Sequence, residues 1–596
     1  NTFVGALAGY QLTVADRNVF VGSYAGYQTV DVDNAVIIGY QAGYSNMTSA
    51  ADGTIAIGYQ AGYGITSGAS NVAIGKSALP ALSTGDSNLG IGDNAGSTLQ
   101  SGDFNHYIGM YSGFYQQTGD KNIAIGYRSQ QGVSSGNRNV SNNTSVGHNS
   151  LYNIVSNDST AVGYQAGYYA SGSNNTFVGS GAGQGGTTSA PFSSGENNTA
   201  VGYQALTAFT EGDHTTAIGY QAGKAQVDGY DNTYIGARSG QANAVGDGNV
   251  TLGDRALYSD TSGHRTIAIG KDALHNFSGS GTTVYNSDIT KIIAIGYHAA
   301  YYMGSTPGGS FPNATRSINN IVIGYHAAWS HYDGGSNVII GTEAVKGIGN
   351  HTQASVYIGE SSGQNVASGS YNVAVGAYTH RYATGSYNTF VGYEAGRGSL
   401  TSAPFSSGQN NVAMGYNALR GFTTGYNNVM VGNYTGDAIT TGESNTALGY
   451  AALSAEDTGT RNVAIGNEAL KVLNYDGAGY NVAVGHRAGY ALTTQTKTIF
   501  IGAFAGSALT TSGDSNMAIG YAAMGGAEVG DGNIAIGRSS MANANASGFH
   551  RNVAIGYETM ANVGSNSAAD NIAIGYQALN DINGNALGNV AIGSYS

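Results

Sequence analysis

The sequence predicts an all-β protein, a parallel β-solenoid or β-roll of about 33 coils. A short apolar run ending in glycine recurs 33 times in 596 residues, and 17 of the 32 gaps between these glycines are 17 residues long. With the glycine numbered position 5, position 4 is Ile, Val, Leu or Met and position 8 is Ala, Ser or Thr in all 33 repeats. Such a repeat cannot bury its apolar face alone, so it gains stability by stacking on its neighbours.

Each repeat begins with a short strand, as in Val72 to Ile74. Strand side chains alternate, so positions 2 and 4 share one face and position 3 takes the other. We expect Val72 and Ile74 to point inward and Ala73 to point outward. By the same rule Ile125 points inward and stacks in one column with Ile74.

The other repeat positions have separate roles. Position 1 is Asn in 25 of 33 repeats, including Asn71 and Asn122. We interpret this column as a ladder of side-chain amides between coils. Position 5, as in Gly75 and Gly126, marks a bend with positive φ or no room for a β-carbon. The small residue at position 8, such as Ala78, predicts a second segment packed tightly across from position 4.

The repeat leaves no stretch for another domain, so we expect a single continuous array over residues 1–596. The two longest gaps, 26 and 28 residues, predict loop insertions at about 271–319. Both ends fall in mid-repeat, which indicates truncation of a longer chain. Coils stacked at about 4.8 Å predict a rod about 160 Å long.

The composition excludes several function classes. Charged residues are only 10% of the chain, and the net charge of −13 is dispersed without a Lys/Arg cluster. We therefore expect no nucleic-acid partner. No run of about 18 apolar residues occurs, so no membrane insertion is expected within this chain. The absence of cysteine excludes a disulfide framework and is compatible with an extracellular fibre.

Two other interpretations of the repeat remain. Glycine-rich polar repeats can be disordered, but the aliphatic residue at every position 4 argues against this. A strand-plus-helix solenoid of the leucine-rich type suits repeats of 20–29 residues. Segments such as "NEALKVL" could form one helical turn, whereas "YQAGY" is a poor helix former.

The lines "NVAIGKSA", "NIAIGYQA" and "NTAVGYQAL" resemble two related groups of proteins. One is the head repeat of trimeric autotransporter adhesins, a left-handed parallel β-roll. The other is the repeat region of bacteriophage tail-fibre proteins. The resemblance covers essentially the whole chain and implies a trimeric, extended surface fibre. The 17-residue coil is longer than that of the adhesins, so their handedness is not carried over.

The sequence contains no motif for a catalytic nucleophile, a phosphate loop or a metal pair, so we expect no enzyme, no cofactor and no metal.

Tyrosine recurs at position 6, where the rings could stack on one another or bind sugars. The inserted loops are candidate binding elements, because loops on a rigid scaffold often carry function. The candidate binding residues there are Tyr301, Tyr302, Trp329, His298 and His326. A row of turn carboxylates, Asp86, Asp103 and Asp120, is interpreted as solvated rather than as a Ca²⁺ site.

Position 3 is apolar or aromatic in 30 of 33 coils. Because we expect it to point outward, it predicts an apolar stripe that other copies cover, most simply in a homotrimer.

The predicted function is the shaft or head of an extended extracellular, cell-surface or virion fibre. Such a fibre would present surfaces or loops to glycans or a host receptor. Alternatives are a self-assembling filament without a receptor and an ice- or glycan-binding protein. An ice binder would need outward threonines, whereas we expect those at position 2 to face inward.

Overall fold

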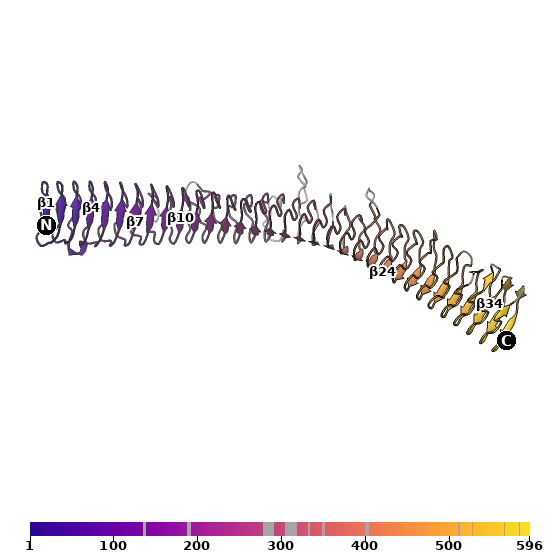
Figure 1. The fold of residues 1–596 in the computed structure, drawn as a ribbon. Helices are drawn as coiled ribbons and strands as arrows, with labels where there is room; N and C mark the ends of the chain where they lie inside the picture. Colours follow the sequence, from indigo (N-terminus) through magenta and orange to yellow (C-terminus); the bar gives the residue numbers. More distant parts are fainter. Residues whose placement is uncertain are drawn as a thin grey trace. The chain divides into compact units, whose positions relative to one another are not determined.

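The computed structural model describes residues 1–596 except 135–138, 188–191, 278–290, 304–318, 332–333, 348–351, 367, 400–404, 511–512, 527, 547, 565–566 and 583–584. It confirms the predicted fold class, an all-β parallel solenoid whose coils mostly repeat every 17 residues (Figure 1). The chain forms two compact units, unit 1 (residues 1–295) and unit 2 (residues 296–596), each described by itself.

The strands of unit 1 form one parallel sheet, with a single 3₁₀ turn at Ser49–Ala51 among its described residues. Its strands are β1 (Thr2–Val4), β2 (Val19–Val21), β3 (Val36–Ile38), β4 (Ile55–Ile57), β5 (Val72–Ile74), β6 (Leu89–Ile91), β7 (His106–Ile108), β8 (Ile123–Ile125), β9 (Thr144–Val146), β10 (Thr160–Val162), β11 (Thr176–Val178), β12 (Thr199–Val201), β13 (Thr216–Ile218), β14 (Thr233–Ile235), β15 (Val250–Leu252), β16 (Ile267–Ile269) and β17 (Ile293–Ile295).

Unit 2 repeats this arrangement and adds a few short strand pairs near its end. Its main strands are β18 (Ile321–Ile323), β19 (Val338–Ile340), β20 (Val356–Ile358), β21 (Val373–Val375), β22 (Thr389–Val391), β23 (Val412–Met414), β24 (Val429–Val431), β25 (Thr446–Leu448), β26 (Val463–Ile465), β27 (Val482–Val484), β28 (Ile499–Ile501), β29 (Met517–Ile519), β31 (Ile534–Ile536), β33 (Val553–Ile555), β36 (Ile572–Ile574) and β39 (Val590–Ile592). The short pairs are β30 (Glu528–Val529) with β32 (Asn545–Ala546), β34 (Asn562–Val563) with β37 (Asp581–Ile582), and β35 (Ala568–Ala569) with β38 (Ala586–Leu587).

Successive strands pair in parallel and in register by motif position. Ile74 lies opposite Ile91, and Ile91 lies opposite Ile108. Identical positions therefore form columns along each sheet. This register follows from the constant spacing of the repeat, because each coil returns the chain to the same place.

The predicted facing of the strand is wrong. Ala73 at position 3 is fully buried, whereas Val72 and Ile74 are half-buried and point away from the coil interior. The middle residue is buried in every main strand except the terminal β1 and β39. Ile125, which we expected inside, is 38% exposed. Alternation requires only that position 3 oppose positions 2 and 4. Both sets are apolar, so hydrophobicity does not decide which one faces inward.

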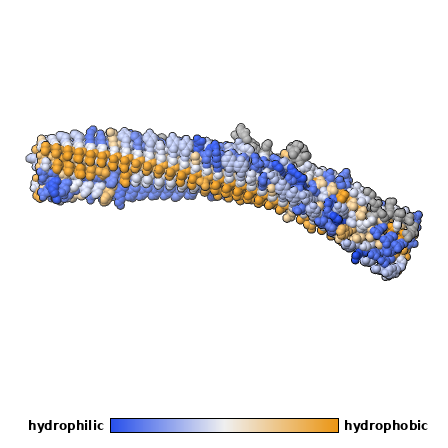
Figure 2. Space-filling view, viewed as in Figure 1, coloured by the Kyte–Doolittle hydropathy of each residue, from blue (hydrophilic) through white to orange (hydrophobic). Residues whose placement is uncertain are grey.

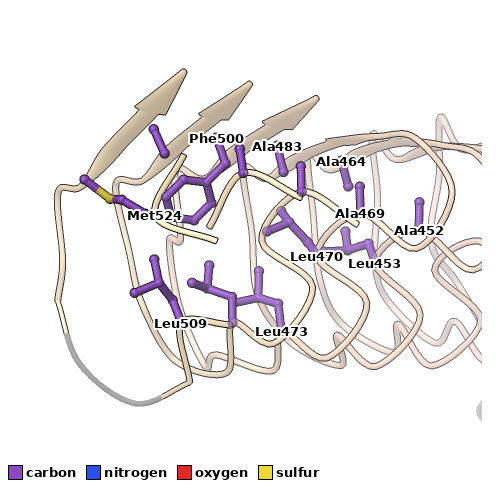
Figure 3. Packing of buried hydrophobic residues seen from close by; sticks show 14 of the residues in the cluster. Ala452, Leu453, Ala464, Ala469, Leu470, Leu473, Ala483, Phe500, Leu509 and Met524 are labelled. Atoms are coloured by element: carbon purple, nitrogen blue, oxygen red, sulfur yellow. The ribbon is translucent and has the colours of Figure 1, made fainter. Parts of the chain in front are cut away.

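The small residue at position 8 packs against position 3 of the next coil rather than across from position 4. The hydroxyls of Ser239 and Thr251 make such a contact, and so do those of Ser129 and Ser145. Two small columns facing each other make the coil thin. The remaining interior is filled by the large residues at positions 9 and 12, as Leu453, Leu470, Leu473 and Leu509 show (Figure 3).

The glycine at position 5 ends each strand for two physical reasons. Gly75 has φ +131°, a backbone conformation that residues with a β-carbon rarely adopt. A β-carbon there would also lie 2.6 Å from the carbonyl oxygen of Gly92 in the next coil. The glycine column therefore lets neighbouring backbones approach closely.

The asparagine at position 1 forms the expected amide ladder. The side-chain oxygen of Asn88 accepts hydrogen bonds from the backbone N–H (3.0 Å) and the side-chain amide (3.0 Å) of Asn105. The Asn105 amide in turn donates to the Gly119 carbonyl at 2.7 Å. These buried bonds satisfy polar groups that the thin coil would otherwise leave unpaired.

Candidate functional site

The outward face of the sheet is one candidate surface. Positions 2 and 4 place two side chains of each strand on this face, and most of them are Val or Ile. Ile218 is 39% exposed, and Leu252, Met414 and Leu448 are also exposed. Figure 2 shows a row of hydrophobic residues running over successive coils. The chain thus has an apolar stripe, but positions 2 and 4 form it rather than position 3.

Six consecutive coils of this face carry threonine at position 2. The residues are Thr144, Thr160, Thr176, Thr199, Thr216 and Thr233, on strands β9 to β14. Each pairs in register with the next along the column. The threonines therefore point outward, which corrects our expectation that they face the interior.

The predicted binding residues of the loop region meet in one aromatic cluster of unit 2. The rings of His298 and His326 stack at 5.1 Å, and their Nδ1 and Nε2 atoms lie 3.1 Å apart. The His326 ring also stacks on Trp329 at 5.2 Å. Tyr301 lies 4.6 Å from His298, and Tyr302 lies 6.1 Å from Trp329 between ring centroids. Most of the inserted loops, residues 278–290 and 304–318, lies outside the described residues.

Burial and the neighbouring imidazole of His298 lower the pKa of His326. Two imidazoles in such close contact repel each other when both are protonated. A proton on His326 is therefore disfavoured relative to a free imidazole. Lys346 lies over Trp329, with its Nζ 5.4 Å from the ring centroid, and forms a 2.6 Å ion pair with Glu343.

Glu343 connects this cluster to an open hollow of about 400 Å³ that the sequence did not reveal. The hollow lies over four successive coils. It is lined by Glu343, Glu360, Ser361, Gln364, Tyr378, Arg381, Tyr393 and Glu394. One sequence signal could have indicated it: at position 6, small residues Thr342 and Ala377 interrupt a column in which tyrosine is common.

The tyrosine columns outside the hollow mainly stack on themselves. At position 6, Tyr40 stacks on Tyr59 and Tyr203 stacks on Tyr220, each pair with ring centroids 5.6 Å apart. At position 10, Tyr10, Tyr27, Tyr44 and Tyr63 form one column with centroid separations of 5.0–5.5 Å. Ring faces inside such a column are covered by the next ring. This arrangement supports the structural interpretation of these tyrosines over sugar binding.

The turn carboxylates form a second ladder. Asp103 Oδ1 accepts the backbone N–H of Asp86 at 2.8 Å, and Asp120 Oδ1 accepts that of Asp103 at 2.9 Å. Each carboxylate thus finds a donor on the preceding coil, which offsets the repulsion along the row. Within the described ranges, no group of three His, Cys, Asp or Glu side chains could hold a metal ion. No helix of the described chain is long and apolar enough to cross a membrane.

His380 and Glu456 are ionisable side chains buried inside coils of unit 2. Burial lowers the pKa of His380 to about 3, and neither ring nitrogen has a hydrogen-bond partner among the described residues. Burial also raises the pKa of Glu456 to about 7, although its Oε1 accepts the Gly459 N–H at 2.7 Å. Neither side chain faces solvent, so both affect stability rather than binding.

The fold and these surfaces define a β-solenoid repeat protein with an apolar outer sheet face. No family model matches the chain, and no curated protein matches it significantly.

Proposed function

We propose that this chain is the shaft or head of an extended extracellular, cell-surface or virion fibre, and that copies of the chain pack together through their outward sheet faces. The observation that carries this proposal is the apolar stripe of positions 2 and 4. The amide and glycine ladders, which repeat from coil to coil, are suited to a rigid structural element.

The size of the stripe supports burial against other copies. Unit 1 presents two outward side chains on each of 17 strands. Eight of these 34 side chains are polar, namely Thr2, His106 and the six threonines of β9 to β14. At roughly 50 Å² exposed for each, the other 26 present on the order of 1,300 Å² of apolar surface, above the 300–600 Å² of the largest patch on a typical monomer. The same area is ample for a stable interface, which needs about 1,000 Å² in total.

We propose that three copies of the chain form one assembly. A flat face running along a solenoid is covered most simply when copies close as a ring about a common axis. The resemblance of the repeat lines to trimeric adhesin heads and tail fibres favours three. The adhesive role, through loops or surface residues that contact glycans or a host receptor, is part of the same proposal.

Native mass spectrometry and sedimentation equilibrium test this proposal directly. The wild-type protein should form an assembly of three chains. A variant with Val201→Lys and Ile218→Lys places charges on the sheet face and should dissociate. The matched control, Tyr203→Lys and Tyr220→Lys, alters the neighbouring position-6 column of the same two coils and should remain trimeric. A soluble, monomeric wild type would reject the proposal.

A second candidate function rests on the threonine row of β9 to β14. None of these six hydroxyls has a hydrogen-bond partner among the described protein groups, so the row presents regularly spaced hydroxyls and methyls to water. Such an array can order water as an ice surface does. Inhibition of ice recrystallisation by the wild type, lost in Thr199→Lys, would support this function. Inactivity of the wild type would exclude it.

A further inference from the structure

The hollow of unit 2 has its polar groups arranged in one connected chain. Lys346 holds Glu343 at 2.6 Å, and the Gln364 amide donates to the other oxygen of Glu343 at 3.1 Å. Arg381 Nε then donates to the Gln364 side-chain oxygen at 2.7 Å. Each group in this chain orients the next, so Arg381 is fixed before any ligand arrives.

Three polar groups of the hollow keep unused hydrogen-bonding capacity. The Oε1 of Glu360 accepts the Tyr378 hydroxyl at 2.9 Å, while its Oε2 has no partner among the described residues. The Arg381 guanidinium lies over the rings of Tyr378 and Tyr382, at 5.1 and 5.2 Å from their centroids. Its terminal nitrogens have no hydrogen-bond partner in the described part of the chain, and neither has the hydroxyl of Ser361. A carboxylate oxygen, guanidinium donors and a hydroxyl therefore converge on one concave surface.

Two tyrosines give the hollow an aromatic side. Tyr416 stacks on one face of Tyr393 at 5.4 Å, and Tyr378 approaches Tyr393 edge-on at 5.7 Å. The small residue Ala377 stands at position 6 of the preceding coil, where many other coils carry a tyrosine. Tyr393 thus has one stacked neighbour and one edge-on neighbour, and its side chain remains 43% exposed.

The charges of the hollow nearly cancel. Lys346 pairs with Glu343, and Arg420 pairs with Glu394 at 2.7 Å. Arg397 also lies 3.7 Å from Glu394, and Glu360 and Arg381 are the other charged residues of the lining, of opposite sign. A strongly anionic or cationic ligand would therefore gain little, whereas a ligand with many neutral hydroxyls can use both the donors and the acceptors.

From this geometry we infer that the hollow binds a neutral saccharide, with the sugar against the exposed part of the Tyr393 ring and hydroxyls bonded to Glu360, Arg381 and Ser361. The aliphatic C–H face of a pyranose suits an aromatic ring, and its hydroxyls suit a carboxylate and a guanidinium. This inference rests on the proposed adhesive role of the fibre and names the ligand class and the site.

Trp329 gives the site a built-in reporter, because it is the only tryptophan in the chain. Its ring contacts Lys346, whose partner Glu343 lines the hollow. We would screen the full chain against an array of neutral, sialylated and sulfated oligosaccharides, and titrate the positives by Trp329 fluorescence and calorimetry.

Glu360→Gln and Arg381→Met should each weaken binding of a neutral oligosaccharide by about tenfold or more, the loss expected for hydrogen bonds to charged groups. The matched control is Glu468→Gln with Arg487→Met, which removes the same two charges from an ion pair, 2.6 Å apart, elsewhere in unit 2. It should leave the affinity unchanged.

Three outcomes would overturn the inference. They are no neutral saccharide bound by the wild type, binding of anionic saccharides only, or an affinity that both hollow variants leave unchanged. Sedimentation of the same samples reports the number of chains independently of saccharide binding, so the two proposals can fail separately. A trimer that binds no saccharide contradicts only the inference, whereas a monomer that binds contradicts only the packing of copies.

Discussion

A β-carbon at Gly240 would lie 2.3 Å from the Cδ1 atom of Tyr234, the buried aromatic residue six positions earlier. The same relationship recurs through the chain: each of the eight coils with Phe or Tyr at position 3 has glycine at position 9. Coils with alanine at position 3 often carry a larger residue at position 9, as in the coil of Ala73 and Leu79. Positions 3 and 9 thus share one interior volume.

Gly240→Ala should destabilise the β14 coil by about 3 kcal/mol, because the new methyl overlaps the Tyr234 ring and the backbone φ is +58°. Tyr234→Ala alone should be similarly harmful, since it leaves a cavity. The double variant Tyr234→Ala with Gly240→Leu recreates the pairing of Ala73 with Leu79 and should recover most of the loss. Hydrogen exchange of the β14 amides measures this locally. Additive losses in the double variant would contradict the shared volume.

Ala124→Asp and Ile125→Asp should have opposite consequences although the residues are neighbours. Ala124 is fully buried, so the charge should cost several kcal/mol of folding stability. Ile125 is 38% exposed and its side chain points outward, so Ile125→Asp should leave the coil folded and weaken association of copies instead. Limited proteolysis and sedimentation distinguish the two effects. Equal loss of folding in both variants would contradict the inward position of Ala124 and the outward position of Ile125.

His380 should make unit 2 sensitive to acid. Burial lowers its pKa in the folded state to about 3, from 6.5 in the unfolded chain, so the folded state binds fewer protons between these values. This contribution to stability is full above about pH 6.5 and is lost as the pH falls, on the order of 2 kcal/mol by pH 5. His380→Leu should reduce the slope of local stability between pH 7 and 5. Replacement of the exposed His214 by Leu is the control and should leave the slope unchanged. An unchanged slope in His380→Leu would contradict the role of His380 in the acid sensitivity.

Glu456 should have the opposite pH dependence. Its folded pKa of about 7 lies above the ordinary value of 4.5, so the folded state binds more protons between these values. Stability should therefore fall as the pH rises from about 4.5 to 7, by on the order of 3 kcal/mol in total. Glu456→Gln, which places at this position the residue type found at Gln226, should remove this dependence. Hydrogen exchange of the β25 and β26 coils at pH 5 and 8 is the measurement, and equal protection in the wild type at both values would count against a buried carboxyl.

The periodic features of this protein could be predicted from sequence. The spacing of Gly75, Gly92 and Gly109, the asparagine column at Asn71 and the aliphatic residue at every position 4 together predicted parallel strands stacked in register. These features depend on backbone geometry and on contacts between identical positions, so one repeat contains the information that all of them need.

The facing of each strand and the location of the hollow were decided only by the tertiary structure. Ala73 and Ile74 are both apolar, so the sequence pattern allowed either to point inward. Ala73 faces inward because the thin coil must match the volumes of positions 3, 8 and 9, and this match is a property of the packed interior. The hollow likewise depends on Glu343, Glu360, Arg381 and Tyr393, which belong to four different repeats. Stacking, rather than proximity in the chain, brings them to one surface.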